Sequence, residues 1–168
     1  MPYIKWDKKR FKIVITIIVI VGLIFPMIYI NAPYKIIEIV TKVTNKSFYS
    51  GREIIWARVY AAMKDPIKIL IGVGSENSIS FGIIGNNRYS LHSSYLTMYA
   101  YYGVIGVLIY YNQIIRCIDK VKITNRKLVL IAGYLSLMIT GFSEIVLCYS
   151  YQALITNIIF GMAVSSVE

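Results

Sequence analysis

Long uncharged stretches alternate with short basic segments along this chain, a pattern that predicts helices crossing a membrane. The first stretch runs from Ile13 to Tyr34 and is long enough for a hydrocarbon core that needs about 20 helical residues. A second runs from Tyr89 to Ile115, and Glu144 is the only charge between Leu128 and Val167. The third stretch can hold two spans joined by a tight turn. We therefore predict an all-α integral membrane protein, one membrane domain over residues 1–168, with four spans at about 12–32, 94–115, 128–146 and 150–167.

The short basic segments predict how these spans are oriented. Residues 1–12 carry five lysines or arginines, and residues 116–127 carry five more. Short segments rich in these residues stay on the cytoplasmic side of a membrane. Four crossings then put both termini in the cytoplasm and leave residues 33–93 as a long loop outside the plasma membrane. A signal peptide is the alternative for the basic N-terminus, but its apolar core would span only about 7 to 15 residues.

The outer loop is itself basic, with eight lysines and arginines against four acidic residues over residues 31–93. This excess either attracts an anionic ligand or is solvated and contacts lipid headgroups. We expect membrane lipids as partners and no nucleic acid. With one histidine and two cysteines, we expect no protein-built metal site and no cofactor.

A short amphipathic helix is predicted within the loop. Ser50-Gly51-Arg52-Glu53 has the spacing of a capping box, in which serine and glutamate bond the first free N–H groups of a helix. Asp65-Pro66 should interrupt that helix. Its apolar stripe, suited to lying on the membrane or on the spans, consists of Ile54, Ile55, Trp56, Val59, Tyr60 and Met63.

Arg52 would stand in the first turn of this helix, where the helix dipole disfavours a cation. A phosphate or diphosphate held by the guanidinium and the free N–H groups would offset that cost. The alternatives are an arginine that reaches lipid phosphate or one that pairs with Glu53.

His92 is expected at the outer mouth of the second span. On a continuous helix Gly103 would fall about 20° from it, so a neighbouring helix could pack closely on the face that presents the imidazole. An imidazole can take a proton from a hydroxyl near neutral pH, and the alternative is a polar anchor at the interface. Glu144 should lie about 25 Å along the third span from Lys127, near the outer surface. There it could pair with a loop arginine or with the imidazole, or simply be solvated.

Four motifs in a fixed order resemble the O-antigen ligase and polysaccharide polymerase family. They are Ser50-Gly51-Arg52 with Ile55-Trp56, Ile71-Gly72-Val73-Gly74, His92-Ser93, and Gly103-Val104-Ile105-Gly106. The resemblance covers roughly residues 45–165, and Gly141-Phe142-Ser143-Glu144 is similar to the family's closing helical hairpin. Members usually have ten or more spans, so the chain resembles their C-terminal portion and is expected to be a partial enzyme.

The resemblance implies a metal-independent glycosyltransferase that moves an undecaprenyl-diphosphate-linked oligosaccharide to a sugar hydroxyl on the outer face. By the resemblance, His92 would activate the acceptor and Arg52 would hold the diphosphate. We also expect Arg58, Arg88 and Glu144 to bind substrate. A composition rich in isoleucine, lysine, tyrosine and asparagine is typical of AT-rich genomes, as in many Gram-positive bacteria, and favours a polymerase over a lipopolysaccharide ligase. The alternatives are a non-enzymatic subunit of a polysaccharide assembly complex and an inactive remnant. Other partners would be assembly proteins or a separate N-terminal half.

Overall fold

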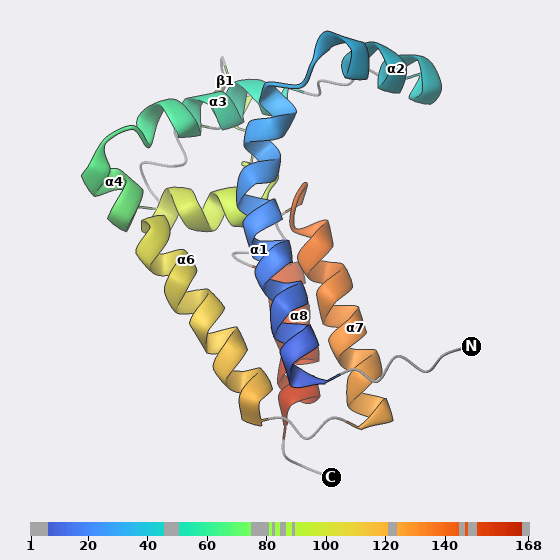
Figure 1. Ribbon diagram of the computed structural model, residues 1–168. Coiled ribbons are helices and arrows are strands. Elements are labelled where there is room, and N and C mark those ends of the chain that lie inside the picture. The colour runs from blue at the N-terminus through green and yellow to red at the C-terminus, as the bar shows by residue number, and fades with distance from the viewer. Residues whose placement is uncertain are drawn as a thin grey trace.

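The computed structural model is almost entirely helical (Figure 1). It describes residues 7–45, 51–74, 81, 83–84, 87–88, 90–120, 124–144, 147 and 151–165. The helices are α1 (Lys8–Ile30), α2 (Tyr34–Thr44), α3 (Arg52–Ala62), α4 (Pro66–Ile71), α6 (Ser94–Lys120), α7 (Asn125–Thr140) and α8 (Tyr151–Val164). A two-residue antiparallel ladder joins β1 (Ile83–Ile84) to β2 (Asn87–Arg88). The all-α expectation is confirmed in outline.

Within the described residues, α1 alone is both long and apolar enough to cross a membrane, and little of it is buried. Its 23 residues correspond to about 34 Å of helix. The side chain of Asp7 accepts from the backbone N–H of Arg10 and caps the start. Shorter apolar helical segments cover Lys127–Thr140 and Ala153–Val164, so the predicted third and fourth spans are shorter in the structure than the sequence suggested.

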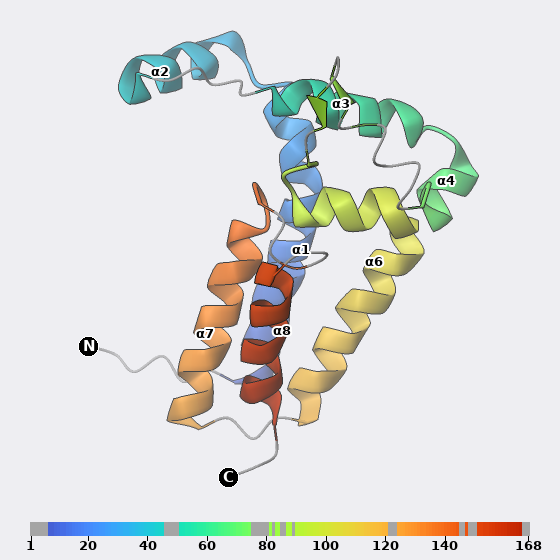
Figure 2. The ribbon, with the colours of Figure 1, turned by 180° about the vertical axis from the view of Figure 1, so that it is seen from behind.

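Four helices form a bundle around one apolar core. α1 packs against α6 and α7, and α7 packs along α8 as an antiparallel hairpin (Figure 2). Basic residues gather where α1 begins, α6 ends and α7 begins, which we call the basic end (Figure 1). There Lys12 pairs with the carboxylate of Asp119, and Lys8 donates to the Asp119 carbonyl. These contacts bring the start of α1 and the end of α6 to the same end of the bundle.

The opposite end of the bundle is covered by α3, which lies across it (Figure 1). The predicted helix at residue 52 is confirmed. Most of its predicted apolar stripe is buried against α1 and α6, but Ile54 is 46% exposed. Asp65 and Pro66 end that segment by starting α4, where the Asp65 carboxylate accepts from the backbone N–H of Ile67 at 2.9 Å. The cluster buried beneath α3 consists of Ile55, Trp56, Val59, Met63, Leu91, Leu96 and Ala100.

The prediction of one straight helix from His92 to Arg116 was wrong. Gly103 has φ 62° and ψ −164°, so α6 is broken there. Residues 94–102 run across the end of the bundle, and residues 104–120 turn along it (Figure 1). His92 precedes the helix altogether, which means that it cannot share a helical face with Gly103.

Close backbone packing explains the break. A Cβ on Gly103 would lie 2.3 Å from the Leu70 carbonyl oxygen, and a Cβ on Gly72 would lie 2.4 Å from the Tyr101 carbonyl. The backbone N–H of Val73 donates to the Ala100 carbonyl at 2.8 Å. Both glycines also have positive φ, which other residues adopt at a cost. The two glycine motifs therefore form one reciprocal contact between α4 and the α6 break.

We expect Gly103→Ala to lower the free energy of unfolding by about 2 kcal/mol or more, because it adds a steric clash to an unfavourable φ. Gly133→Ala is the matched control, since a Cβ there meets nothing within 4 Å and should change stability by no more than about 1 kcal/mol. Thermal unfolding of the detergent-solubilised chain measures both. Equal stability of the two variants would contradict the reciprocal packing.

Candidate functional site

Arg52, His92 and Glu144 meet at the end of the bundle opposite the basic end. Arg52 Nη2 donates to Glu144 Oε1 at 3.1 Å, and His92 Nδ1 lies 3.7 Å from Glu144 Oε2. The three side chains are 28%, 34% and 49% exposed, so each is part-sheltered yet reachable by a ligand. Of the alternatives that the sequence left open for Glu144, the structure shows the pair with a loop arginine, Arg52, and places the imidazole of His92 nearby.

The position of Glu144 differs from the one expected. The predicted span of 128–146 ends as a helix at Thr140, and Glu144 lies in the turn that follows α7. The start of α6 holds this turn. Ser94, fully buried, donates from its hydroxyl to the Glu144 carbonyl at 2.9 Å and accepts from the Leu147 N–H at 3.1 Å. Its backbone N–H donates to the Gly141 carbonyl at 2.9 Å. Ser94 therefore holds the backbone of the turn that carries the Glu144 carboxylate next to His92.

His92 is held in an unusual backbone conformation. Its φ of 48° lies in the left-handed region, which a non-glycine residue enters at a cost of about 1 kcal/mol or more. The neighbouring residues are anchored on both sides. The indole N–H of buried Trp56 donates to the Leu91 carbonyl at 2.5 Å, and buried Ser93 accepts from the Leu96 N–H at 3.3 Å. Trp56 thus couples the helix that carries Arg52 to the turn that carries His92.

Arg52 is the first residue of α3, one residue later than the capping box predicted. The N-cap is Gly51, in the left-handed region, and no side chain among the described residues caps the helix. Ser50, the predicted capping residue, lies outside the described residues. A guanidinium beside the first N–H groups of a helix is suited to binding an anion.

The carboxylate of Glu53 adds a polar group close to Arg52 in sequence. Its Oε2 is buried and has no hydrogen-bond partner among the described residues. A buried carboxylate oxygen is costly without a donor. Sequence reasoning considered Glu53 only as a partner for Arg52 or as part of the cap.

Of the two other predicted substrate arginines, Arg58 alone has a side chain that the structure describes. Arg58 is exposed on α3. It follows Arg52 by six positions, which places it about 240° further around the helix. Arg88 lies in β2, where its backbone pairs with that of Ile83, and its side chain lies outside the described residues.

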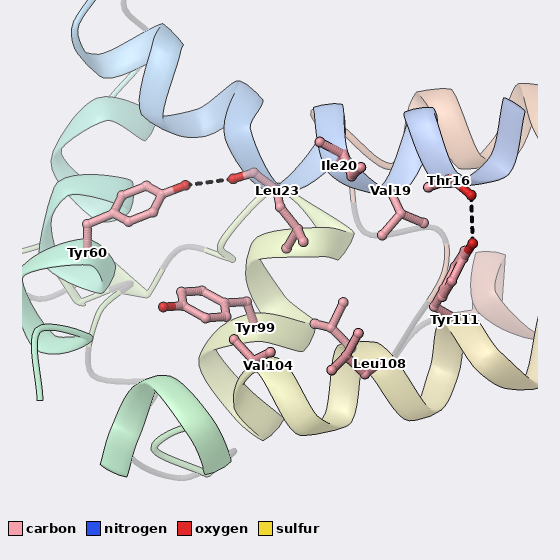
Figure 3. Close-up of a pocket in the computed structure, with 10 residues that line it drawn as sticks. Thr16, Val19, Ile20, Leu23, Tyr60, Tyr99, Val104, Leu108 and Tyr111 are labelled. Carbon is pink, nitrogen blue, oxygen red and sulfur yellow. Dashed lines mark hydrogen bonds between the residues drawn. The ribbon is translucent and has the colours of Figure 1, made fainter. Parts of the chain in front are cut away.

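An apolar cavity of about 440 Å³ opens between α1, α3 and α6 (Figure 3). Tyr60 of α3 closes one end by donating to the Leu23 carbonyl at 3.0 Å. Burial raises the pKa of Tyr60 to about 12, so the phenol stays a neutral donor. At the other end, the hydroxyls of Thr16 and Tyr111 share a hydrogen bond of 2.6 Å. Aliphatic side chains line the space between, namely Val19, Ile20, Leu23, Val104, Val107 and Leu108.

Comparisons with protein-family models, with curated proteins and with solved structures found no match. The family resemblance therefore rests on the motif set alone. In the fold, two of those motifs form the α4–α6 glycine contact, and the Arg52 and His92 motifs lie on either side of Glu144.

We expect Ser94→Ala to destabilise the chain by about 1–3 kcal/mol, because it leaves the buried Leu147 N–H without its acceptor. Ser136→Ala is the control, since Ser136 is an exposed serine on α7. Thermal unfolding compares them. If both variants have the same melting temperature as the wild-type chain, Ser94 does not hold the Glu144 turn.

Proposed function

We propose that the chain is a multi-pass plasma-membrane protein in which α1, residues 104–120 of α6, α7 and α8 cross the bilayer. Large apolar side chains point outward from all four helices, as lipid-facing residues do. They include Ile17, Ile24 and Met27 on α1, Leu108 and Ile109 on α6, Val129 and Ile139 on α7, and Leu154, Ile158 and Met162 on α8. A water-soluble bundle would cover such faces with charge.

The basic end supports the orientation. Short basic segments remain in the cytoplasm, so both termini would be cytoplasmic and the site would face outward. α7 and α8 have 16 and 14 residues, or about 24 and 21 Å of helix. Local thinning of the bilayer and flanking residues would accommodate this mismatch.

For the activity, we propose a polymerase of surface polysaccharide repeat units that uses an undecaprenyl-diphosphate-linked oligosaccharide as donor. The observation that carries the proposal is the Glu144 carboxylate, which lies between a guanidinium and an imidazole. One of these groups is suited to a diphosphate and the other to a hydroxyl. The motif resemblance supplies the reaction that uses both.

In this mechanism the acceptor hydroxyl gives its proton to His92 as its oxygen attacks the anomeric carbon of the donor. A glycosidic C–O bond forms, the bond from that carbon to the diphosphate oxygen breaks, and the diphosphate leaves with the bonding electron pair. Arg52 and the start of α3 would stabilise the charge on the leaving group. Glu144 beside Nδ1 favours the tautomer with the proton on Nδ1, which leaves the Nε2 lone pair free for the acceptor.

The Figure 3 cavity is consistent with a lipid-linked donor. It lies on the same side of α3 as α1 and α6, and it is apolar along its length. A hydrocarbon chain fits such a lining, as in most apolar ligand pockets.

We expect His92→Ala to abolish long polymer in the cells that encode the chain, because loss of a general base costs about 10²- to 10⁴-fold in rate. Arg52→Ala should do the same, and Arg52→Lys should keep part of the activity, since lysine retains the charge but loses the planar fork. Polymer length on a gel, at matched protein levels, measures these effects.

Lys64→Ala is the control for removing a cation from the same segment, because Lys64 is exposed beyond the end of α3. It should leave the polymer unchanged. Normal polymer with His92 and Arg52 both replaced would refute the glycosyltransferase and favour a non-enzymatic subunit of the assembly complex.

A further inference from the structure

α2 has the pattern of an amphipathic helix, although sequence reasoning did not identify it. Its apolar residues follow a helical spacing on one side, and its polar residues occupy the other. On the polar side, Lys42 Nζ donates to Glu38 Oε1 at 2.6 Å, an i,i+4 pair that satisfies both charges locally. The apolar side consists of Ile36, Ile37, Ile39, Val40 and Val43.

Nothing in the described part of the chain covers that apolar side. No residue of α2 is buried, and Ile36, Ile39 and Val43 are 49%, 61% and 80% exposed. The helix extends away from the bundle (Figures 1 and 2). A contiguous exposed apolar face indicates that something outside the described fold covers it.

The connection to α1 restricts what that covering can be. Only Asn31, Ala32 and Pro33 separate the two helices, so α2 begins within about 14 Å of the end of α1. A 23-residue α1 already exceeds a hydrocarbon core of about 30 Å. In the proposed membrane orientation, α2 therefore begins in the headgroup layer of the outer leaflet. It also runs across the axis of α1 rather than along it (Figure 1).

We propose that α2 is an in-plane membrane anchor whose apolar side is covered by lipids of the outer leaflet. An interfacial helix of this kind buries its apolar face about 5–10 Å into the boundary between headgroups and acyl chains. Lys35 and Lys42 would lie at the level of the lipid phosphates, where a cation is favoured. A lipid surface matches both the apolar face and the basic flank of α2. The proposal rests on the membrane placement above and does not depend on the glycosyl transfer.

The anchor has a consequence for the candidate site. Arg52 begins α3 eight residues after the end of α2 at Thr44. A helix fixed in the headgroup layer would keep the start of α3 near the membrane surface. A phosphate attached to a membrane lipid would then be at the height of the guanidinium.

The test uses the full chain with Cys117 and Cys148 replaced by serine, reconstituted in vesicles of phosphatidylcholine and phosphatidylglycerol. Single cysteines at Ile39 and at Glu38 carry an environment-sensitive fluorophore, and spin-labelled lipids act as quenchers. We expect the probe at residue 39 to emit at shorter wavelength and to lose about half or more of its emission to a quencher placed 5–10 Å deep. The probe at residue 38 should behave as in water.

A third probe at Ile17, an exposed residue of α1, separates the two proposals. Quenching at residue 17 without quenching at residue 39 would overturn the anchor and leave the membrane placement intact. A shifted emission at residue 39 that lipid quenchers do not reach would mean that a protein partner or a second copy covers α2, and it would also overturn the anchor. Absence of quenching at residue 17 would overturn both.

Discussion

The break in α6 at Gly103 is the constraint on which the candidate site depends. A helix continuing through this position would carry residues 94–102 away from the end of the bundle. With φ at 62°, the chain instead lies across that end, and Ser94 reaches the turn after α7. Gly72 packs closely against the Tyr101 backbone, so the break is also a contact between the two glycine motifs. Its geometry is therefore fixed by tertiary packing, while the glycine at position 103 permits the positive φ.

The site that results is assembled from three distant segments. Arg52 and Glu144 are 92 residues apart in the chain and share a hydrogen bond. Trp56 ties the first segment to the second, and Ser94 ties the second to the third. Such an ion pair at a partly exposed position adds at most about 1 kcal/mol to stability. The arrangement is therefore better explained by what the three groups can bind than by what they contribute to folding.

Local signals in the sequence predicted local structure well. The apolar run of α1, the start of α3 to within one residue and the interruption at Asp65 and Pro66 all depend on neighbouring residues. The prediction of a straight α6 failed because packing against α4, which is distant in sequence, imposes a positive φ at Gly103. The spacing of Ile36, Val40 and Val43 could have identified α2. The sequence left open whether Glu144 pairs with a loop arginine, pairs with the imidazole or is solvated, because its possible partners are distant in sequence. In the structure it pairs with Arg52 and lies near His92, from a turn and not from a helix.

The central claim is that Glu144 orients His92 for proton transfer. Nitrogen NMR of the ¹⁵N-histidine-labelled chain in lipid tests it directly, because the sequence contains one histidine. The account predicts that the neutral imidazole carries its proton on Nδ1, beside the Glu144 carboxylate, and that Glu144→Gln shifts the ring toward a mixture of tautomers. A proton on Nε2 in the wild type, or the same tautomer mixture in both proteins, would contradict the account.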